Sequence, residues 1–355
     1  MKIAQIAPLY ESVPPKYYGG TERVVSWLTE ELVRQGHDVT LFAAGDSDTK
    51  AELVPITRCA LRLDRNVVDY MAHHILLLEK VAKRAHEFDI IHSHVDYLLF
   101  PIVRRMNVPL LTTLHGRLDL PDLQPLYREY RDMPLVSISD TQREPLPFAN
   151  WVATVHHGLP ADLHTYRDKP GKYLAFLGRI SPEKRVDLAI EIATRVGMPL
   201  KIAAKVDRVD REYHETVIKP LLKRPNIEFI GEIGDKEKSE FLGNAYALLF
   251  PIDWPEPFGL VMIEAMACGT PVIARRCGAV PEVLEHGVTG FIVDDVEEAV
   301  RAVEQVPTLN RRRIREVFEK RFTAERMAFN YVRQYERLLN KQRVKTAKPL
   351  VHSAA

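Results

Sequence analysis

The chain has 355 residues, more than one hydrophobic core usually organises, so we expect two domains of ordinary size. Hydrophobic residues make up 46% of it, charged residues 27%, and the formal net charge is +1, which argues against a nucleic acid or another polyanion as partner. The apolar start is too short for a signal peptide and no apolar run reaches bilayer length, so we expect a cytoplasmic protein. Cys59, Cys268 and Cys277 lack metal-ligand or disulfide spacing, and we interpret them as core or loop thiols.

The first half of the chain alternates short β-rich apolar runs with amphipathic helical stretches, a pattern typical of parallel βαβ units. A helix is predicted over 21–35, where Val24, Leu28 and Leu32 belong to one apolar stripe and Gly36 ends it. A second long helix is predicted over 67–86. We expect the strands of this half at 2–8, 38–44, 90–93, 109–114, 135–139 and 152–157.

A new βα cycle begins after the polar stretch 158–172, which we interpret as the domain boundary. Its strands are expected at 173–177, 200–204, 227–230, 247–251 and 271–274. The predicted fold class is therefore α/β, with two Rossmann-like, doubly wound parallel sheets that face each other across a cleft. The predicted parts are an N-terminal domain over 1–160, a C-terminal domain over 161–322, a final helix within 323–341 (Thr323 to Asn340) and a disordered tail over 342–355.

Residues 251–274, PIDWPEPFGLVMIEAMACGTPVIA, carry the strongest signal. A strand ends near Pro251, a loop with two prolines follows, and a short helix is predicted over 258–268. Glu256 and Glu264 stand eight positions apart, so they can line one side of a pocket. Taken singly, Glu256 could instead cap the helix and Glu264 could lie on a solvated face.

The start of this helix presents the backbone N–H groups of Phe258, Gly259 and Leu260 at the positive end of the helix dipole. A phosphate or a row of sugar hydroxyls suits such amides. Ionised carboxylates only accept hydrogen bonds, and a ribose or hexose diol offers two donors. The segment therefore indicates a site for a sugar phosphate.

Arg179 and Lys184 stand on either side of a tight turn, after the first strand of the second domain and at the start of its helix. Two cations at a helix start can neutralise a diphosphate. Lys184 alone could equally be an ordinary surface charge. The basic run 311–313 is interpreted as a solvated helix face rather than a polyanion site.

In the first domain, Gly20 belongs to a glycine pair between the first strand and the first helix, where a simple turn is the plainer interpretation. The sequence there is not GxGxxG, which disfavours an NAD-dependent oxidoreductase. His115 stands at a strand end, a position that fits either a structural histidine or one facing the cleft. His92 and His94 are weaker candidates, which could shape the acceptor side with Asp96.

The segment E-P-F-G-L-V-M-I-E-A-M-A-C-G-T-P-V resembles the signature of glycosyltransferase family 4, two glutamates separated by seven residues in the C-terminal domain of a retaining GT-B enzyme. The resemblance extends to the subgroup with antibiotic-decorating, avilamycin-type transferases. It implies that Glu256 faces the donor sugar and that Glu264 holds the nucleotide ribose. It assigns Arg179 and Lys184 to the donor diphosphate.

The same resemblance implies roles for other strand-end positions. Gly20 would approach the donor phosphates or the acceptor, and His115 would lie near the donor sugar. The backbone at Ile233 would meet the nucleobase, with Lys238 close by. Where the family commonly has a glycine turn this chain has Lys205, and our hypothesis is that Lys205 adds positive charge beside the phosphates.

The resemblance implies a retaining hexosyltransferase with a front-face mechanism, for which a UDP- or GDP-sugar is the expected donor. No metal and no cofactor are expected, since cationic side chains can take the part of a metal ion. The acceptor could be a small molecule, a saccharide or a lipid-linked molecule, with peripheral membrane contact left open and no integral membrane segment. The alternatives are an isomerase like the sugar-nucleotide 2-epimerases and a non-catalytic nucleotide-sugar-binding module.

Overall fold

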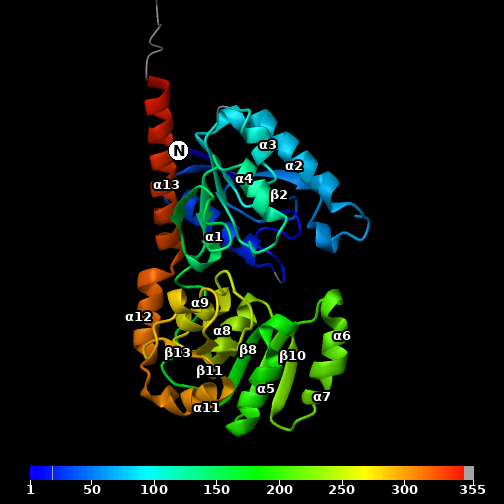
Figure 1. Cartoon of the computed structure of the whole chain (residues 1–355), viewed down its shortest axis with the longest axis vertical. Helices are drawn as coiled ribbons and strands as arrows, with labels where there is room; N and C mark the ends of the chain where they lie inside the picture. Colours follow the sequence, from blue (N-terminus) through cyan, green and yellow to red (C-terminus); the bar gives the residue numbers. More distant parts are fainter. Residues whose placement is uncertain (18, 107, 348–355) are drawn as a thin grey trace, which may run out of the picture.

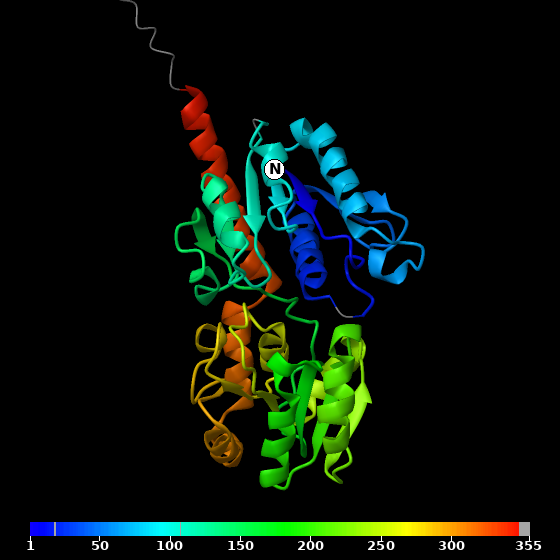
Figure 2. The same cartoon turned by 45° about the vertical axis from the view of Figure 1, so that its right-hand side comes forward.

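The computed structural model describes residues 1–17, 19–106 and 108–347, and it shows two parallel sheets stacked along the long axis of the molecule (Figures 1 and 2). The first sheet has the strand order β3-β2-β1-β4-β5-β6-β7 and the second the order β10-β9-β8-β11-β12-β13. In both sheets the order reverses beside the first strand, as in doubly wound folds. The predicted fold class, two Rossmann-like domains, is confirmed.

Most strands away from the sheet edges are short, buried apolar runs. The first sheet consists of β1 (Lys2–Ile6), β2 (Asp38–Ala44), β3 (Glu52–Thr57), β4 (Ile90–Ser93), β5 (Leu110–Thr113), β6 (Leu135–Ser137) and β7 (Trp151–Thr154). The second consists of β8 (Tyr173–Arg179), β9 (Leu200–Lys205), β10 (Ile227–Gly231), β11 (Ala245–Phe250), β12 (Val272–Arg275) and β13 (Gly290–Val293).

Helices cover both faces of each sheet (Figure 1). The α-helices are α1 (Gly20–Arg34), α2 (Tyr70–Arg84), α3 (Phe100–Val103), α4 (Leu123–Glu129), α5 (Val186–Arg195), α6 (Arg211–Tyr213), α7 (Lys219–Leu221), α8 (Asp235–Gly243), α9 (Leu260–Ala267), α10 (Val280–Val283), α11 (Val296–Gln305), α12 (Arg311–Arg321) and α13 (Ala324–Ala347). Single turns are η1 (Leu61–Leu63), η2 (Ala85–Glu87), η3 (Thr141–Arg143), η4 (Pro182–Lys184), η5 (Arg208–Asp210), the π-helical η6 (His214–Ile218) and η7 (Val306–Thr308).

Two edge strands were not predicted from the sequence. β3 contains Pro55 and is only half-buried, which is tolerated at a sheet edge because proline cannot donate to a central ladder. β13 has four buried residues and lies at an edge of the second sheet, next to β12. Both strands extend the predicted sheets without changing their topology.

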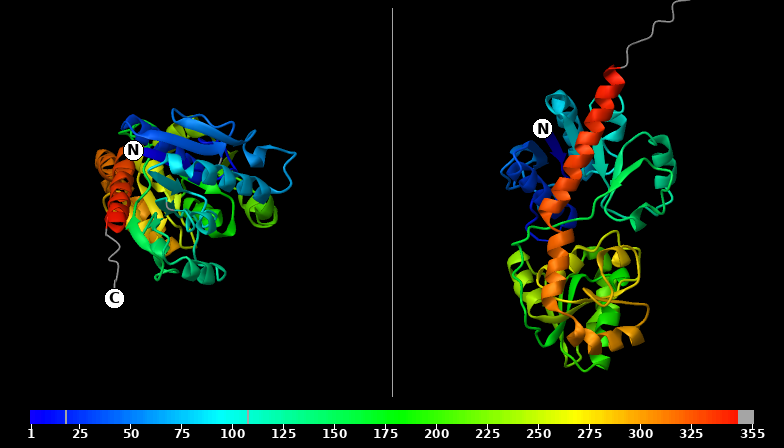
Figure 3. Two further views of the ribbon diagram at one scale, coloured as in Figure 1. Left: turned by 90° about the horizontal axis from the view of Figure 1, so that it is seen from above. Right: turned by 90° about the vertical axis from the view of Figure 1, so that its left-hand side faces the viewer.

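Helix α13 leaves the C-terminal domain directly after α12 and packs against α1 of the N-terminal domain (Figures 2 and 3). Met327, Tyr331 and Tyr335 on one face of this helix are fully buried there. The helix continues to Ala347, so residues 342–347, predicted to belong to a disordered tail, are helical. Residues 348–355 of that tail lie outside the described part of the chain.

The two connections between the domains cross in close contact. The backbone of Leu159 pairs with residues on both sides of Thr323: Leu159 N donates to Phe322 O at 3.0 Å, and Ala324 N donates to Leu159 O at 2.9 Å. A Cβ at Gly158 would lie 2.2 Å from the carbonyl oxygen of Thr323, so only glycine lets the two backbones approach this closely.

The basic run 311–313 was interpreted as a solvated helix face, and this is wrong for Arg311. Its side chain is buried and donates to the carbonyl oxygens of Arg167, Gly243 and Ala245 and to the hydroxyl of Thr270. A planar guanidinium with five donors can satisfy several carbonyls at once, which the charge pattern alone does not reveal. The three cysteines are free thiols, with Cys268 buried and the other two half-buried, as predicted.

Candidate active site

The carboxyl ends of both sheets and the loops that follow them line one cavity of about 500 Å³. This is the edge at which doubly wound sheets bind ligands. The cavity brings together all twelve residues that the sequence singled out for donor binding or chemistry: Gly20, His115, Arg179, Lys184, Lys205, Ile233, Lys238, Glu256, Phe258, Gly259, Leu260 and Glu264.

Helix α9 begins two residues later than predicted, because Gly259 adopts a left-handed conformation with φ of 81°. A Cβ at Gly259 would lie 2.8 Å from Cε of Met262, so both backbone conformation and space favour glycine. No side chain caps the helix, and Leu260 and Val261 of its first turn line the cavity. The positive end of this helix is therefore available to an anionic ligand.

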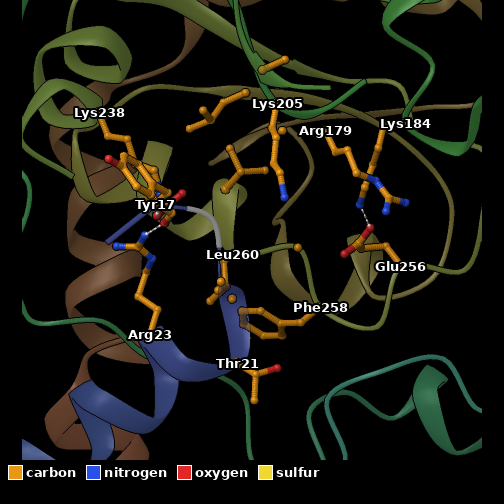
Figure 4. A pocket seen from close by; sticks show the side chains of 18 of the residues that line it. Tyr17, Thr21, Arg23, Arg179, Lys184, Lys205, Lys238, Glu256, Phe258 and Leu260 are labelled. Atoms are coloured by element: carbon orange, nitrogen blue, oxygen red, sulfur yellow. Dashed lines mark hydrogen bonds and ion pairs between the residues drawn. The ribbon is translucent and has the colours of Figure 1, made fainter. Parts of the chain in front are cut away.

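Arg179 ends β8, Lys184 ends η4, and both side chains point to the same corner of the cavity as Glu256 (Figure 4). Lys184 forms an ion pair with Glu256, which also accepts a hydrogen bond of 2.8 Å from Nε1 of Trp254. Arg179 pairs with a cluster of three carboxylates, Glu183, Asp207 at 3.7 Å and Asp210 at 3.5 Å. Both cations thus have carboxylate partners.

At the other end of the cavity, Nζ of Lys238 lies 2.8 Å from Oε1 of Glu264, whose side chain is 4% exposed. Burial by itself raises the pKa of Glu264, but the adjacent Lys238 holds it below its ordinary value. Glu264 is therefore an ionised carboxylate, which can only accept hydrogen bonds. Asp235 lies 3.6 Å from Lys238 and pairs across the cleft with Arg23 of α1.

Lys205 ends β9 and points into the cavity between these two groups (Figure 4). Its Nζ lies 2.6 Å from Oδ1 of Asp207, and the side chain is 15% exposed. The position agrees with the hypothesis of an added positive charge, and its effect on the donor remains a prediction.

Two helix N-termini meet in the cavity, that of α1 from the N-terminal domain and that of α9 from the C-terminal domain. A Cβ at Gly20, the first residue of α1, would lie 3.6 Å from Cδ1 of Leu260, the first residue of α9. Both N-termini carry a partial positive charge, so they add to the attraction for an anion.

His115 follows β5 and lines the cavity from the N-terminal domain. Its Nε2 lies 2.9 Å from Nδ1 of His94, and its ring stacks on His157 with centroids 5.3 Å apart. Burial lowers the pKa of His115 to about 3, so the imidazole is neutral at any working pH. It therefore contributes an uncharged ring to the cavity wall.

Three weaker candidates do not line the cavity. His92 and His94 are buried beneath its floor, where burial lowers the pKa of each well below its ordinary value. Asp96 lies in a left-handed turn with φ of 49°. His92 and His94 therefore do not shape the acceptor side directly, since their buried side chains point into the domain, whereas a part for the exposed Asp96 stays a prediction.

The sequence interpretation missed several residues of the cavity. Glu22 is 5% exposed, and burial raises its pKa to about 7. Its position two residues after Gly20 could have indicated it. Arg23, Arg62 and Tyr10 also line the cavity, but only the tertiary structure brings them to the second domain.

In the described residues, no group of three or more His, Cys, Asp or Glu side chains is placed to hold a metal ion. Asp46 and Asp48 have a spacing that can bind metals, but Asp46 pairs with Lys16 at 3.0 Å and accepts from Ala60 N at 2.8 Å, away from the cavity. No described helix combines the length and hydropathy needed to cross a bilayer.

Comparison with solved structures supports the architecture. The chain superimposes on AviGT4, a glycosyltransferase involved in avilamycin A biosynthesis, with a TM-score of 0.74 and 22% identity, covering 96% of this chain and 98% of that one. It superimposes equally well on Anabaena Alr3699/HepE in complex with UDP and glucose, with a TM-score of 0.74, 19% identity and coverage of 95% and 100%. At these identities the likeness shows the fold, and it does not establish the avilamycin-type subgroup.

Curated relatives match at similar distance. D-inositol 3-phosphate glycosyltransferase of Mycolicibacterium smegmatis is 26% identical over 78% of this chain and 75% of its own length. N-acetyl-alpha-D-glucosaminyl L-malate synthase of Bacillus anthracis is 26% identical over 78% and 81%.

Two family models match consecutive parts of the chain. Residues 18–173 match the model described as Glycosyltransferase Family 4, and residues 165–321 match the one described as Glycosyl transferases group 1. Together they cover every strand of the two sheets except β1, and most of the residues that line the cavity. The chain is therefore a glycosyltransferase of the GT-B fold, with a family 4 N-terminal domain and a group 1 C-terminal domain.

Proposed function

We propose that this glycosyltransferase moves a hexose from a UDP- or GDP-sugar to an acceptor hydroxyl, with retention of the anomeric configuration and without a metal ion. One observation carries the proposal: cations, a helix N-terminus and two carboxylates converge on one cavity. The groups are Arg179, Lys184, Lys205, the start of α9, Glu256 and Glu264.

Arg179 and Lys184 receive the diphosphate of the donor in this proposal. With no donor bound they pair with Glu183 and Glu256, so the incoming phosphates exchange with those carboxylates as partners. Negative charge grows on the departing diphosphate in the transition state, and a preplaced donor there is worth about 3–4 kcal/mol. The amides at the start of α9 act on the same charge.

The two glutamates divide the remaining recognition. Glu264 is ionised and buried beside Lys238, which suits the hydroxyls of the ribose. Glu256 lies beside Lys184, close to the diphosphate end, which suits the donor sugar. Resemblance to family 4 supports both assignments.

Transfer proceeds on one face of the sugar. The bond between the anomeric carbon and the phosphate oxygen breaks as the bond to the acceptor oxygen forms, and the acceptor proton passes to the departing phosphate. The electron pair leaves with the diphosphate, so no covalent enzyme intermediate is required. Contacts between the domains, such as Arg23 with Asp235, help to exclude water from this reaction.

The acceptor is a hydroxyl compound that enters from the N-terminal domain. The names of the relatives mention inositol 3-phosphate and L-malate, which makes both compounds suitable for a first acceptor panel. We also propose that the protein is cytoplasmic, so that it binds its nucleotide-sugar donor in the cytoplasm.

Thermal denaturation with UDP, GDP, UDP-glucose and GDP-mannose tests donor binding. A ligand at one hundred times its Kd stabilises the folded state by about 2.7 kcal/mol, enough to raise the Tm by several degrees. NMR of the product's anomeric proton then reports retention. Binding without turnover by any acceptor would favour a binding module, a sugar altered without an acceptor would favour an isomerase, and no binding would contradict the proposal.

A further inference from the structure

Behind His115 runs a buried chain of hydrogen bonds that connects the cavity to helix α13. His115 Nε2 lies 2.9 Å from His94 Nδ1, and His94 Nε2 lies 2.8 Å from Oε1 of Gln5 on β1. The amide nitrogen of Gln5 donates to the hydroxyl of Tyr335 on α13 at 3.3 Å. A strand from one end of the sequence and a helix from the other thus meet beneath the site.

The series of hydrogen bonds continues beyond Tyr335. The Tyr335 hydroxyl lies 2.7 Å from Nδ1 of His92, and Nε2 of His92 lies 2.8 Å from Oγ1 of Thr113. Thr113 in turn donates to the hydroxyl of Tyr331 at 3.0 Å. None of the six residues behind His115 is more than 3% exposed, so water does not compete for these bonds.

The direction of each bond fixes where the protons lie. The amide oxygen of Gln5 can only accept, so His94 carries its proton on Nε2. Burial lowers the pKa of His94 and of His115, which leaves one proton on each ring. The free lone pair of His94 is therefore on Nδ1, where it accepts the Nε2 proton of His115.

This order leaves His115 with a lone pair on Nδ1. In the described part of the chain that nitrogen has no hydrogen-bond partner, and it is shielded from solvent while the residue lines the cavity. An unpaired buried N–H would cost about 1–3 kcal/mol, so an unprotonated Nδ1 is the consistent state. Stacking on His157 with an interplanar angle of 16° holds the ring in this orientation.

We infer that Gln5 and Tyr335 are positioning residues: the α13 hydroxyl orients the Gln5 amide, the amide fixes the tautomers of His94 and His115, and His115 is thereby held at the cavity wall as a neutral ring with Nδ1 unprotonated. The part that this ring plays in turnover rests on the proposed function. The tautomer is a property of the free protein. Helix α13, which joins the two domains, thereby acts on the site without touching the ligand.

The free protein provides the first test. In protein labelled with ¹⁵N-histidine, two-bond ¹H–¹⁵N correlations distinguish the two imidazole tautomers, and His115→Gln assigns the signal. We expect His115 to be protonated on Nε2 alone between pH 6 and pH 8. A signal from the Nδ1–H form, or from a mixture, would overturn the inference.

Variants provide the second test. Gln5→Leu removes the acceptor that faces His94, and we expect both His115 tautomers together with an approximately tenfold lower kcat and a KM for the donor within about twofold. Tyr335→Phe removes the hydroxyl that the amide faces and should give a smaller shift in the same direction. Tyr331→Phe is the matched control, because it removes the same hydroxyl group at the far end of the series of hydrogen bonds. It should leave the tautomer of His115 unchanged.

Each outcome is decisive for one idea. A wild-type His115 signal in Gln5→Leu would overturn the role of Gln5, and equal behaviour of the two tyrosine variants would overturn that of Tyr335. If no donor and acceptor pair gives turnover, the tautomers still decide this inference. An Nε2-protonated His115 in an inactive protein would then reject only the proposed function.

Discussion

The two walls of the cavity hold their polar groups in different ways. On the C-terminal wall, cations are paired with carboxylates: Arg179 with Glu183, Lys184 with Glu256, Lys205 with Asp207 and Lys238 with Glu264. The N-terminal wall also carries ion-paired arginines, Arg62 with Glu11 and Arg23 with Asp235, but its His115 and His157 are neutral because burial lowers their pKa, and hydrogen bonding and stacking orient them.

The difference matters because charge acts over distance and hydrogen bonds act only in contact. Pairing with carboxylates stabilises the cations of the C-terminal wall in the free protein. The same cations can exchange these carboxylates for a diphosphate when it binds. The neutral rings on the opposite wall do not repel the cations across the cavity, and neutral imidazoles can discriminate between individual hydroxyls. We therefore expect nucleotide affinity to depend on one wall and turnover to depend on both.

The largest effect is expected for Arg179→Ala and Lys184→Ala. Each removes a cation from the leaving diphosphate, so kcat/KM should fall by about 10²–10³, equivalent to about 3–4 kcal/mol. Steady-state kinetics with the donor identified by thermal denaturation measure the loss.

Arg275→Ala is the matched control for these variants. Arg275 ends a strand of the same sheet and pairs with Asp253, but it does not line the cavity. Its replacement should leave kcat/KM within about twofold of wild type, since a pair at the surface contributes little. Equal losses in all three variants would show that the C-terminal wall has no special part in catalysis.

His115→Ala addresses the opposite wall. Loss of the imidazole from the cavity wall should lower kcat by about 10-fold to 30-fold, or about 1.4–2 kcal/mol, while the Kd of UDP or GDP alone stays within about twofold. Isothermal titration with the nucleotide and kinetics with the donor separate the two quantities. Weaker binding of UDP or GDP in this variant would contradict the idea that nucleotide affinity depends on the C-terminal wall alone.

The same contrast explains what could be predicted from the sequence. Glu256, Gly259 and Glu264 belong to one continuous segment after one strand, so strand, turn and helix signals place them together. The start of α9 was misplaced because Gly259 adopts a left-handed conformation, which the local pattern does not specify. A local pattern therefore gave the residues of the C-terminal wall but not its finer geometry.

Long-range contacts account for most of what was missed. Arg23 meets Asp235 across 212 positions, and Gln5 meets Tyr335 across 330. No periodicity or motif connects such pairs, because their meeting depends on how two domains and a crossing helix pack. The neutral state of His115 follows from the same packing, so it could not be predicted from the sequence either.

A contact between the two domains should show in the pH dependence of the free energy of unfolding. Glu282 of α10 accepts hydrogen bonds from Asp140 N at 2.7 Å and Thr141 N at 2.8 Å in the N-terminal domain. Burial opposes its ionisation, but these bonds and that of His156 lower the pKa of Glu282 from 4.5 to about 2. Because the folded pKa is depressed, the stabilisation is present above about pH 4.5 and is lost as the pH falls towards 2.

For Glu282→Gln we expect a free energy of unfolding lower by about 1–2 kcal/mol at pH 7, after allowance for solvent screening, and a difference that shrinks below pH 4. Urea denaturation at both pH values measures it. Glu285→Gln is the control, since Glu285 pairs with Arg321 at 3.0 Å within the C-terminal domain. A pH-independent difference for Glu282→Gln would contradict the role of its charge.

Among these variants, Lys205→Ala should have the smallest effect on donor binding. It tests whether the set of cations that bind the diphosphate extends to Lys205. Lys205 is already paired with Asp207 and shares the diphosphate with two other cations, so its loss should weaken donor binding by about threefold to fivefold, or less than 1 kcal/mol. Lys201→Ala is matched to it, because Lys201 lies on the same strand, pairs with Glu228 at 3.1 Å and does not line the cavity. Isothermal titration should show a weaker donor Kd for Lys205→Ala and a wild-type Kd for Lys201→Ala. An unchanged Kd in both would remove Lys205 from the donor site and leave the phosphates to Arg179 and Lys184.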